Sequence, residues 1–127
     1  MPHPVMQSLV PNRNTTLNGH PLANPLQIGL KYTEHYITTK DNVKLHAWFI
    51  PSANTNAAYT VLYMHSNAGN IGHSNAIYHY LFKLLGCSIF TFDYRGYGMS
   101  TGTPSVEGFW RDCDAVIEYM KTIKEID

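Results

Sequence analysis

The sequence is poor in cysteine, balanced in charge and without a long hydrophobic run. Only two of its 127 residues are cysteines, with no CxxC pair and no cluster of cysteine and histidine, so a disulfide scaffold is excluded and no metal or other cofactor is expected. Nine basic against nine acidic residues leave zero formal charge, which gives no reason to expect nucleic acid as a partner. The longest apolar stretch, residues 57–64, is much shorter than the roughly 20 residues of a membrane helix. We therefore expect a protein with no transmembrane segment in a reducing, cytoplasmic compartment.

Proline is concentrated at the start of the chain and scarce afterwards. Residues 1–28 hold five of the seven prolines, among several asparagines and with no lasting periodicity, which predicts an extended segment. The first residues have neither the basic start nor the apolar stretch of a signal peptide. Residues 29–127 are then expected to form one folded domain.

Strand patterns occupy three parts of this domain. Residues 30–50 alternate in polarity around turn residues at 40–42, which predicts a β-hairpin. Residues 59–64 are a short, almost wholly apolar run, typical of a strand that is buried on both faces, and residues 88–92 are expected to form the next strand.

Helical patterns follow each of these last two strands. The first has apolar residues at helical spacing and is expected to end at Gly86 in a left-handed conformation; its apolar positions are Ile77, Leu81, Leu84 and Leu85. The second is amphipathic and begins after Ser105, a suitable N-cap. The resulting order is a hairpin followed by a βαβα unit, which predicts an α/β fold with a mostly parallel sheet.

Two glycine-containing loops fall where such a sheet binds its ligands. Ligands of parallel α/β sheets bind beyond the carboxyl ends of the strands. Residues 65–72 follow the strand at 59–64, and residues 93–102 follow the strand at 88–92. We expect the chemistry of the protein to lie in these two loops.

Both loops carry motifs that resemble a known family. The run Leu-Tyr-Met-His-Ser-Asn-Ala-Gly-Asn at residues 62–70 and the run Phe-Asp-Tyr-Arg-Gly-Tyr-Gly-Met-Ser at residues 92–100 are similar to the N-terminal half of α/β-hydrolases. Within that superfamily they look closest to the intracellular group that includes acyl-protein thioesterases. The resemblance covers about residues 26–123 and implies an incomplete α/β-hydrolase fold that stops before the strand carrying the nucleophile elbow.

The resemblance also implies an oxyanion hole in the first loop. In the family, the residue after His-Gly donates a backbone N–H to the oxyanion, and here that residue is Asn67. His65, Ser66, Ala68 and Gly69 are expected to shape the loop around it. Ser66 occupies a position where glycine is usual in the family, and a serine with positive φ would be strained.

The implied function is that of a serine hydrolase acting on esters, thioesters or amides, with a small acyl-type substrate. The nucleophile, acid and histidine of the triad follow the elbow strand in these proteins, so none is expected before Asp127 and the chain alone is expected to be inactive. The missing strands would leave the strand at 59–64 with an open edge, which predicts self-association. The alternative is a non-catalytic protein that uses half of the fold as a binding or regulatory module.

Residues 98–102 also match the Gly-x-Ser-x-Gly pattern of a nucleophile elbow. Such an elbow joins a buried strand directly to a helix. Ser100 instead lies well beyond the end of its strand and is followed by Pro104 before the next helix begins. The context therefore favours a loop serine over a nucleophile.

Neither a dinucleotide-binding loop nor a metal site is favoured by the spacing of the residues. The second loop contains three glycines before a helix, Gly96, Gly98 and Gly102. A dinucleotide-binding loop would begin directly after the strand, but here Asp93 and Arg95 come first. No later strand supplies the acidic residue that a dinucleotide site needs. In the resembled family, Asp93 and Arg95 look structural. The seven histidines show no metal-ligand spacing.

Overall fold

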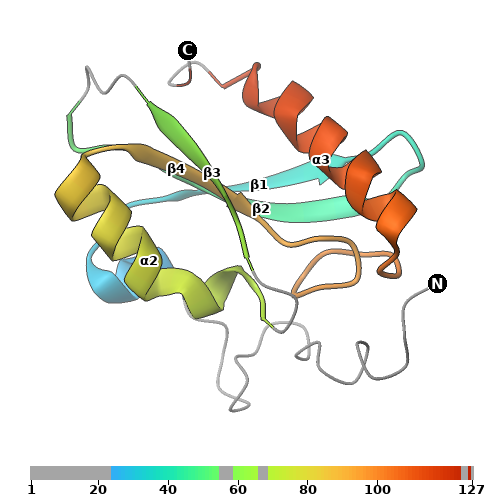
Figure 1. Ribbon diagram of the computed structural model, residues 1–127, viewed down its shortest axis with the longest axis horizontal. Coiled ribbons are helices and arrows are strands. Elements are labelled where there is room, and N and C mark those ends of the chain that lie inside the picture. Colours follow the sequence, from blue (N-terminus) through green and yellow to red (C-terminus); the bar gives the residue numbers. More distant parts are fainter. Residues whose placement is uncertain (1–23, 55–58, 66–68, 124–125, 127) are drawn as a thin grey trace.

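Three consecutive strands are followed by a helical segment, a fourth strand and a second long helix (Figure 1). The computed structural model describes residues 24–54, 59–65, 69–123 and 126. In chain order the elements are η1 (Pro25–Ile28), β1 (Thr33–Thr38), β2 (Lys44–Ile50), β3 (Thr60–Met64), η2 (Ile71–Ser74), α2 (Asn75–Tyr80), η3 (Leu81–Leu85), β4 (Ser88–Phe92) and α3 (Val106–Met120). This succession confirms the predicted α/β class.

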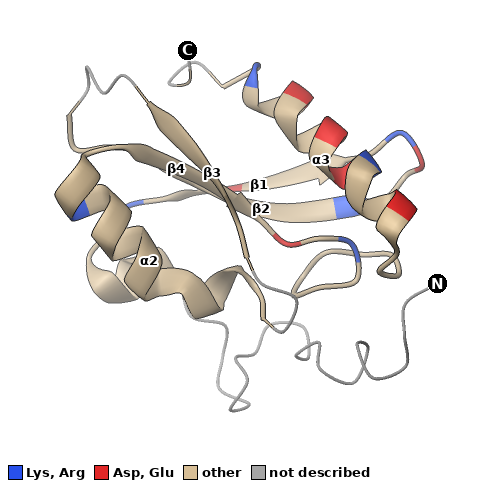
Figure 2. Ribbon diagram, in the orientation of Figure 1, with Lys and Arg blue, Asp and Glu red and all other residues tan. Residues whose placement is uncertain are grey.

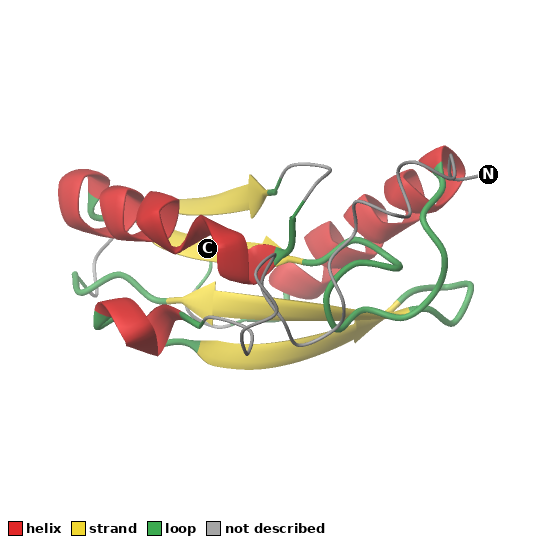
Figure 3. Cartoon of the chain, turned by 90° about the horizontal axis from the view of Figure 1, so that it is seen from below, coloured by secondary structure: helices red, strands yellow, loops and turns green. Residues whose placement is uncertain are grey.

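The four strands lie side by side in one sheet, in the order β1-β2-β4-β3 (Figure 3). β1 and β2 form the predicted antiparallel hairpin, β2 is also antiparallel to β4, and β3 is parallel to β4. The prediction of a mostly parallel sheet is therefore wrong for these four strands. Parallel neighbours need a crossover connection, and among the described strands only β3 and β4 are joined by a helix. β3 lies at a sheet edge, as predicted.

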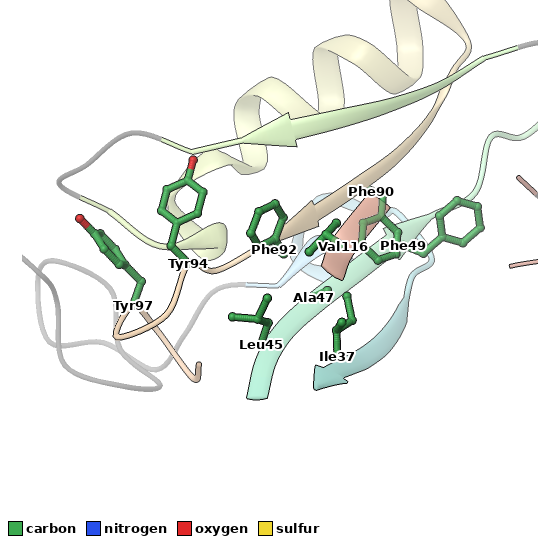
Figure 4. Close-up of a cluster of buried hydrophobic side chains, with 9 residues drawn as sticks. All are labelled: Ile37, Leu45, Ala47, Phe49, Phe90, Phe92, Tyr94, Tyr97 and Val116. Atoms are coloured by element: carbon green, nitrogen blue, oxygen red, sulfur yellow. The ribbon is translucent and has the colours of Figure 1, made fainter. Parts of the chain in front are cut away.

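Alternation along the central strands gives the sheet two apolar faces. β2 supplies Leu45 and Phe49 to a cluster that Val116 of α3 covers (Figure 4), and it supplies Trp48 to a second cluster that includes Tyr78 of α2. Strands β2 and β4 are covered on both faces, so nearly all of their residues are buried. This burial on both faces also includes the polar residues of β4, Ser88 and Thr91.

Helix α3 begins where the sequence predicts. The Oγ atom of Ser105 accepts a hydrogen bond of 2.9 Å from the N–H of Gly108, which satisfies one of the free donors at the start of the helix. Val116 is fully buried, while Phe109 and Cys113 on the same face are at least partly buried. The 3.6-residue periodicity therefore identified the correct face.

Helix α2 and the π-helix η3 form the other predicted helix, and Gly86 ends it with a left-handed φ of 63°. Three of the four apolar positions that predicted this helix are nevertheless exposed; the exposed fractions are 41% for Ile77, 68% for Leu84 and 63% for Leu85. Tyr78 of this helix is fully buried in the core, and Leu81 and Phe82 pack against the same cluster while partly buried. The wider turn of the π-helix also rotates its residues away from the face expected for a regular α-helix.

The N-terminal part of the described chain is a short turn. Asn24 accepts a hydrogen bond of 2.9 Å from the N–H of Leu26, and Gly29 closes η1 with a φ of 78°. Leu30 then packs in the cluster of Trp48. Residues 25–28 thus form a 3-10 turn at the end of the segment predicted to be extended, and residues 1–23 of that segment lie outside the described residues.

Candidate functional site

The two predicted loops begin at neighbouring strand ends. His65 directly follows β3, and Asp93 directly follows β4, which is the parallel neighbour of β3. Because parallel strands end at the same edge of a sheet, the two side chains meet there: His65 Nε2 lies 2.9 Å from Asp93 Oδ1. The side chains are 2% and 0% exposed, so the contact is shielded from water.

Asp93 holds both ends of the first loop. Its Oδ1 atom contacts His65 and also accepts a hydrogen bond of 2.9 Å from the N–H of Ile71, the first residue of η2. The segment between these contacts includes Ser66, Asn67 and Ala68, which lie outside the described residues. One buried oxygen thus fixes the residues on either side of the predicted oxyanion loop. We call Asp93 with its contacts to His65 and Ile71 the loop clamp.

A tyrosine that follows β4 holds the backbone at the first end of the loop. The hydroxyl of Tyr94 donates a hydrogen bond of 2.5 Å to the carbonyl oxygen of His65. The rings of these two residues stack with centroids 4.3 Å apart, and Tyr97 packs against the same imidazole at 5.4 Å. Burial raises the pKa of Tyr94, so its hydroxyl stays protonated and able to donate.

The second end of the loop is a cap made by Asn70 and His73. Asn70 Oδ1 accepts from the N–H of Gly72 at 2.8 Å, and the N–H of Asn70 donates to His73 Nδ1 at 3.0 Å. Burial lowers the pKa of His73, which favours the neutral ring that this acceptor role requires. A side chain on Gly69 would come within 2.7 Å of His73 Nδ1, so this position needs glycine for lack of space.

Ser100 is part of the scaffold of the second loop. It is fully buried; its hydroxyl donates to the carbonyl oxygen of Asp93 at 2.6 Å and accepts from the N–H of His46 at 2.9 Å. A nucleophile has to be accessible to substrate and paired with a base. The structure therefore supports the prediction that Ser100 is a loop serine.

Gly98 lies directly against the loop clamp. Its φ is 47°, and a Cβ atom there would overlap with Asp93 Oδ2. The glycine is thus explained by a left-handed backbone against a buried carboxylate. In the sequence, Gly98 was considered only as part of the family motif, the Gly-x-Ser-x-Gly pattern and a disfavoured dinucleotide loop, and its contact with Asp93 was missed.

Arg95 ties the second loop to the rest of the domain, as expected. Its guanidinium contacts Asp41 in the β1–β2 turn at 2.7 Å and Asp112 in α3 at 2.8 Å. Hydrogen bonding to Arg95 holds the pKa of Asp41 well below its usual range, whereas burial raises the pKa of Asp112. These partners lie in two different parts of the fold, which is the arrangement of a structural link.

The described residues contain no group of three or more His, Cys, Asp or Glu side chains placed to hold a metal ion. In the same residues, no helix is long and apolar enough to cross a membrane.

Curated proteins of several organisms are similar to this chain, although no family model matches it. It is 35% identical over 103 residues to the alpha/beta hydrolase domain-containing protein WAV2 of Arabidopsis thaliana, a match that covers 81% of this chain and 33% of WAV2. It is 35% identical over 97 residues to protein bem46 of Schizosaccharomyces pombe, covering 76% and 32%. It is also 42% identical over 94 residues to an uncharacterized membrane protein of Saccharomyces cerevisiae, covering 74% and 32%. The chain thus spans about a third of the length of these relatives.

Solved structures share the same arrangement of elements. The esterase Pf2001 of Pyrococcus furiosus superposes with a TM-score of 0.71 at 26% identity, covering 91% of this chain and 42% of the esterase. An alpha-beta hydrolase of Vibrio vulnificus shares the fold, with a TM-score of 0.64 at 20% identity, covering 100% of this chain and 38% of that one. Given these matches and a sheet whose parallel strands end at the loop clamp, the chain belongs to the α/β-hydrolase superfamily and spans a part of its fold.

Proposed function

We propose that this chain supplies the oxyanion-hole loop of a serine hydrolase, with the backbone N–H of Asn67 as a donor to the oxyanion. The loop clamp carries the proposal, because Asp93 Oδ1 lies 2.9 Å from both His65 Nε2 and the N–H of Ile71. A loop fixed on both sides can present a backbone donor to developing negative charge with little reorganisation. The name of the Pyrococcus esterase supports an ester as substrate, and our proposal extends to thioesters and amides with a small acyl group.

In this proposal, residues 1–127 provide no nucleophile, acid or catalytic histidine. The Gly-x-Ser-x-Gly serine, Ser100, is buried and both hydrogen bonds of its hydroxyl serve the scaffold. The triad and the acyl pocket would come from the part of the family fold that this chain does not span. The role left to the chain is electrostatic stabilisation of the transition state.

Proline and alanine at position 67 separate backbone from side-chain chemistry. In the protein as its gene encodes it, Asn67→Pro removes the N–H, and we expect the kcat/KM for p-nitrophenyl acetate to fall about 100-fold or more, the usual effect of losing one oxyanion donor. Asn67→Ala keeps the N–H and should cost only a few-fold. Circular dichroism checks that the proline variant folds.

Two results would count against the proposal. Small, equal effects of both substitutions in folded proteins would show that the N–H of Asn67 is not a donor. An unsubstituted protein that hydrolyses no acyl substrate would favour the non-catalytic binding module instead.

A further inference from the structure

The side chain that closes the cap at the second end of the loop is a histidine. Asn70 and His73 form a capping box, in which His73 Nδ1 accepts a hydrogen bond of 3.0 Å from the backbone N–H of Asn70. Glutamate or glutamine commonly has this role at the third position of a helix. Histidine is the one side chain whose ordinary pKa lies between about pH 5 and 8. This cap can therefore be broken by a single proton in mildly acidic solution.

Only one form of the imidazole can make this hydrogen bond. Nδ1 is an acceptor in the neutral ring that carries its hydrogen on Nε2, and both ring nitrogens are donors once the ring is protonated. A protonated His73 would present an N–H to the N–H of Asn70 across the same 3.0 Å. Two donors cannot form a hydrogen bond with each other, so protonation removes this contact and leaves both groups unpaired.

The charged groups that act on His73 come from other elements of the fold. Neither η2 nor α2 contains Asp, Glu, Lys or Arg (Figure 2). Among the described residues, Asp93 after β4 and His65 after β3 act on the imidazole through their charge. Burial lowers the pKa of His73, Asp93 opposes this change and His65 adds to it. The ring is therefore neutral at neutral pH and gains its proton below the ordinary pKa of 6.5.

The imidazole holds the loop backbone between the loop clamp and the proposed oxyanion donor. Asp93 Oδ1 accepts from the N–H of Ile71 at 2.9 Å, and His73 Nδ1 accepts from the preceding N–H, that of Asn70. Two consecutive backbone N–H groups are thus held by two side chains, and His73 holds the one nearer to the donor. A Cβ atom on Gly69 would lie 2.7 Å from the same nitrogen, so the ring also packs directly against the backbone there.

We propose that His73 is a positioning residue for the oxyanion loop, and that binding of a solvent proton at its Nδ1 atom switches the loop off in acid. This inference rests on the proposed function of Asn67. Neutral His73 holds Asn70, and this contact keeps the N–H of Asn67, three residues earlier, directed at the oxyanion. Protonated His73 releases Asn70, while Asp93 still holds Ile71. A backbone donor stabilises the transition state only while it is held in place, so hydrolysis is lost before the fold is.

The pH profile of hydrolysis tests this role. The protein as its gene encodes it is assayed with p-nitrophenyl acetate from neutral to acidic pH, with circular dichroism at each pH to check the fold. The triad histidine that we expect from the rest of the family fold takes up one proton, which alone would lower kcat/KM about tenfold per pH unit. His73 takes up a second proton, so the decline should steepen to about 100-fold per pH unit below its pKa.

Glutamine at two histidine positions provides matched variants. His73→Gln keeps an acceptor for the N–H of Asn70 and does not titrate, so kcat/KM at neutral pH should stay within about threefold and the one-proton decline should return. His79→Gln removes an exposed histidine of α2 and should keep the two-proton decline. His73→Ala has no acceptor and should lower kcat about tenfold at neutral pH with little change in KM.

Hydrogen exchange tests the switch without a variant and without hydrolysis. In the unsubstituted protein, NMR should show that the Asn70 amide loses its protection in acid before the Ile71 amide does. Constant protection of Asn70 would overturn the proposal, as would a one-proton decline in the unsubstituted protein or a two-proton decline in folded His73→Gln. If the Asn67 variants show that Asn67 is not a donor, the proposed function fails, and the exchange of Asn70 still decides whether His73 controls this end of the loop.

Discussion

Gly98 and Gly86 provide a matched test of the loop clamp. Both have left-handed backbones, with φ values of 47° and 63°. A Cβ atom on Gly98 would overlap with Asp93 Oδ2, whereas a Cβ atom on Gly86 would meet nothing within 4 Å. Alanine at either site imposes the same type of backbone strain, and only alanine at Gly98 displaces the carboxylate.

The difference between the two substitutions can be worked out from the contacts. A left-handed alanine costs about 1–2 kcal/mol, and this is the whole effect expected for Gly86→Ala. At Gly98 the displaced Asp93 also loses its contacts with His65 Nε2 and the N–H of Ile71, each 2.9 Å long. Hydrogen bonds to charged groups contribute about 1.5–3 kcal/mol each, so the two lost contacts and the backbone strain together should lower the free energy of unfolding of Gly98→Ala by about 4–8 kcal/mol.

Both losses of unfolding free energy can be measured by urea unfolding of the protein as its gene encodes it, with the fluorescence of the buried Trp48 as the signal. If the proposed oxyanion loop is correct, Gly98→Ala should also reduce hydrolysis of p-nitrophenyl acetate more than Gly86→Ala does. Equal losses of stability in the two variants would show that Asp93 can move without consequence, and the loop clamp would then have no energetic role.

Three further predictions concern other parts of the chain. Ser100→Ala should lower the free energy of unfolding by about 1–3 kcal/mol, because the hydrogen bonds of Ser100 to Asp93 and His46 are lost. Hydrolysis should remain measurable in this variant. A variant that is as stable as the unsubstituted protein but inactive would contradict a scaffold role. Burial lowers the pKa of His73 from its ordinary value of 6.5. The neutral ring of His73 should therefore contribute fully to the free energy of unfolding above about pH 6.5, and this contribution should be lost as the pH falls through the lowered pKa. The urea midpoint of His73→Gln should not show this loss at low pH. Residues 1–127 in isolation should self-associate and unfold broadly, since β3 is half-buried at a free edge, and a single sharp calorimetric transition would refute this.

Local patterns predicted the parts of the fold that local interactions determine. The hairpin of β1 and β2 follows from alternation on either side of a turn, and α3 follows from its periodicity and the cap at Ser105. The resemblance implied that β2 lies beside β4, and the structure confirms this order. The antiparallel direction of the pair was missed, because nothing in either strand alone states its direction. The exposure of Leu84 and Leu85 was missed because a π-helical turn has no signal in apolar spacing.

The candidate site was predictable in position and less so in its contacts. Strands that both end in glycine-containing loops predicted that the two loops begin at one edge of the sheet, and the contact between His65 and Asp93 confirms this. The role of Asp93 toward His65 depends on which strands are neighbours, and sequence spacing does not contain that information. A signal was available at Gly98, because a glycine shortly after a buried acidic residue at a strand end suggests a close approach of the backbone.

The geometry of the site depends chiefly on one strand. β3, which leads into the proposed oxyanion loop, is half-buried, and among the described strands it pairs only with β4. β4 is buried along its whole length, and the residues that follow it, Asp93 and Tyr94, supply the contacts that hold His65. The described ends of the loop are therefore held by residues that follow β4, the buried neighbour of β3. Helix α2 contacts the second end of the loop directly, because the hydroxyl of Tyr78 donates a hydrogen bond of 2.6 Å to the carbonyl oxygen of Ile71. Substitutions that loosen β4 should therefore disturb the His65 end of the loop, whereas Tyr78→Phe should disturb the Ile71 end.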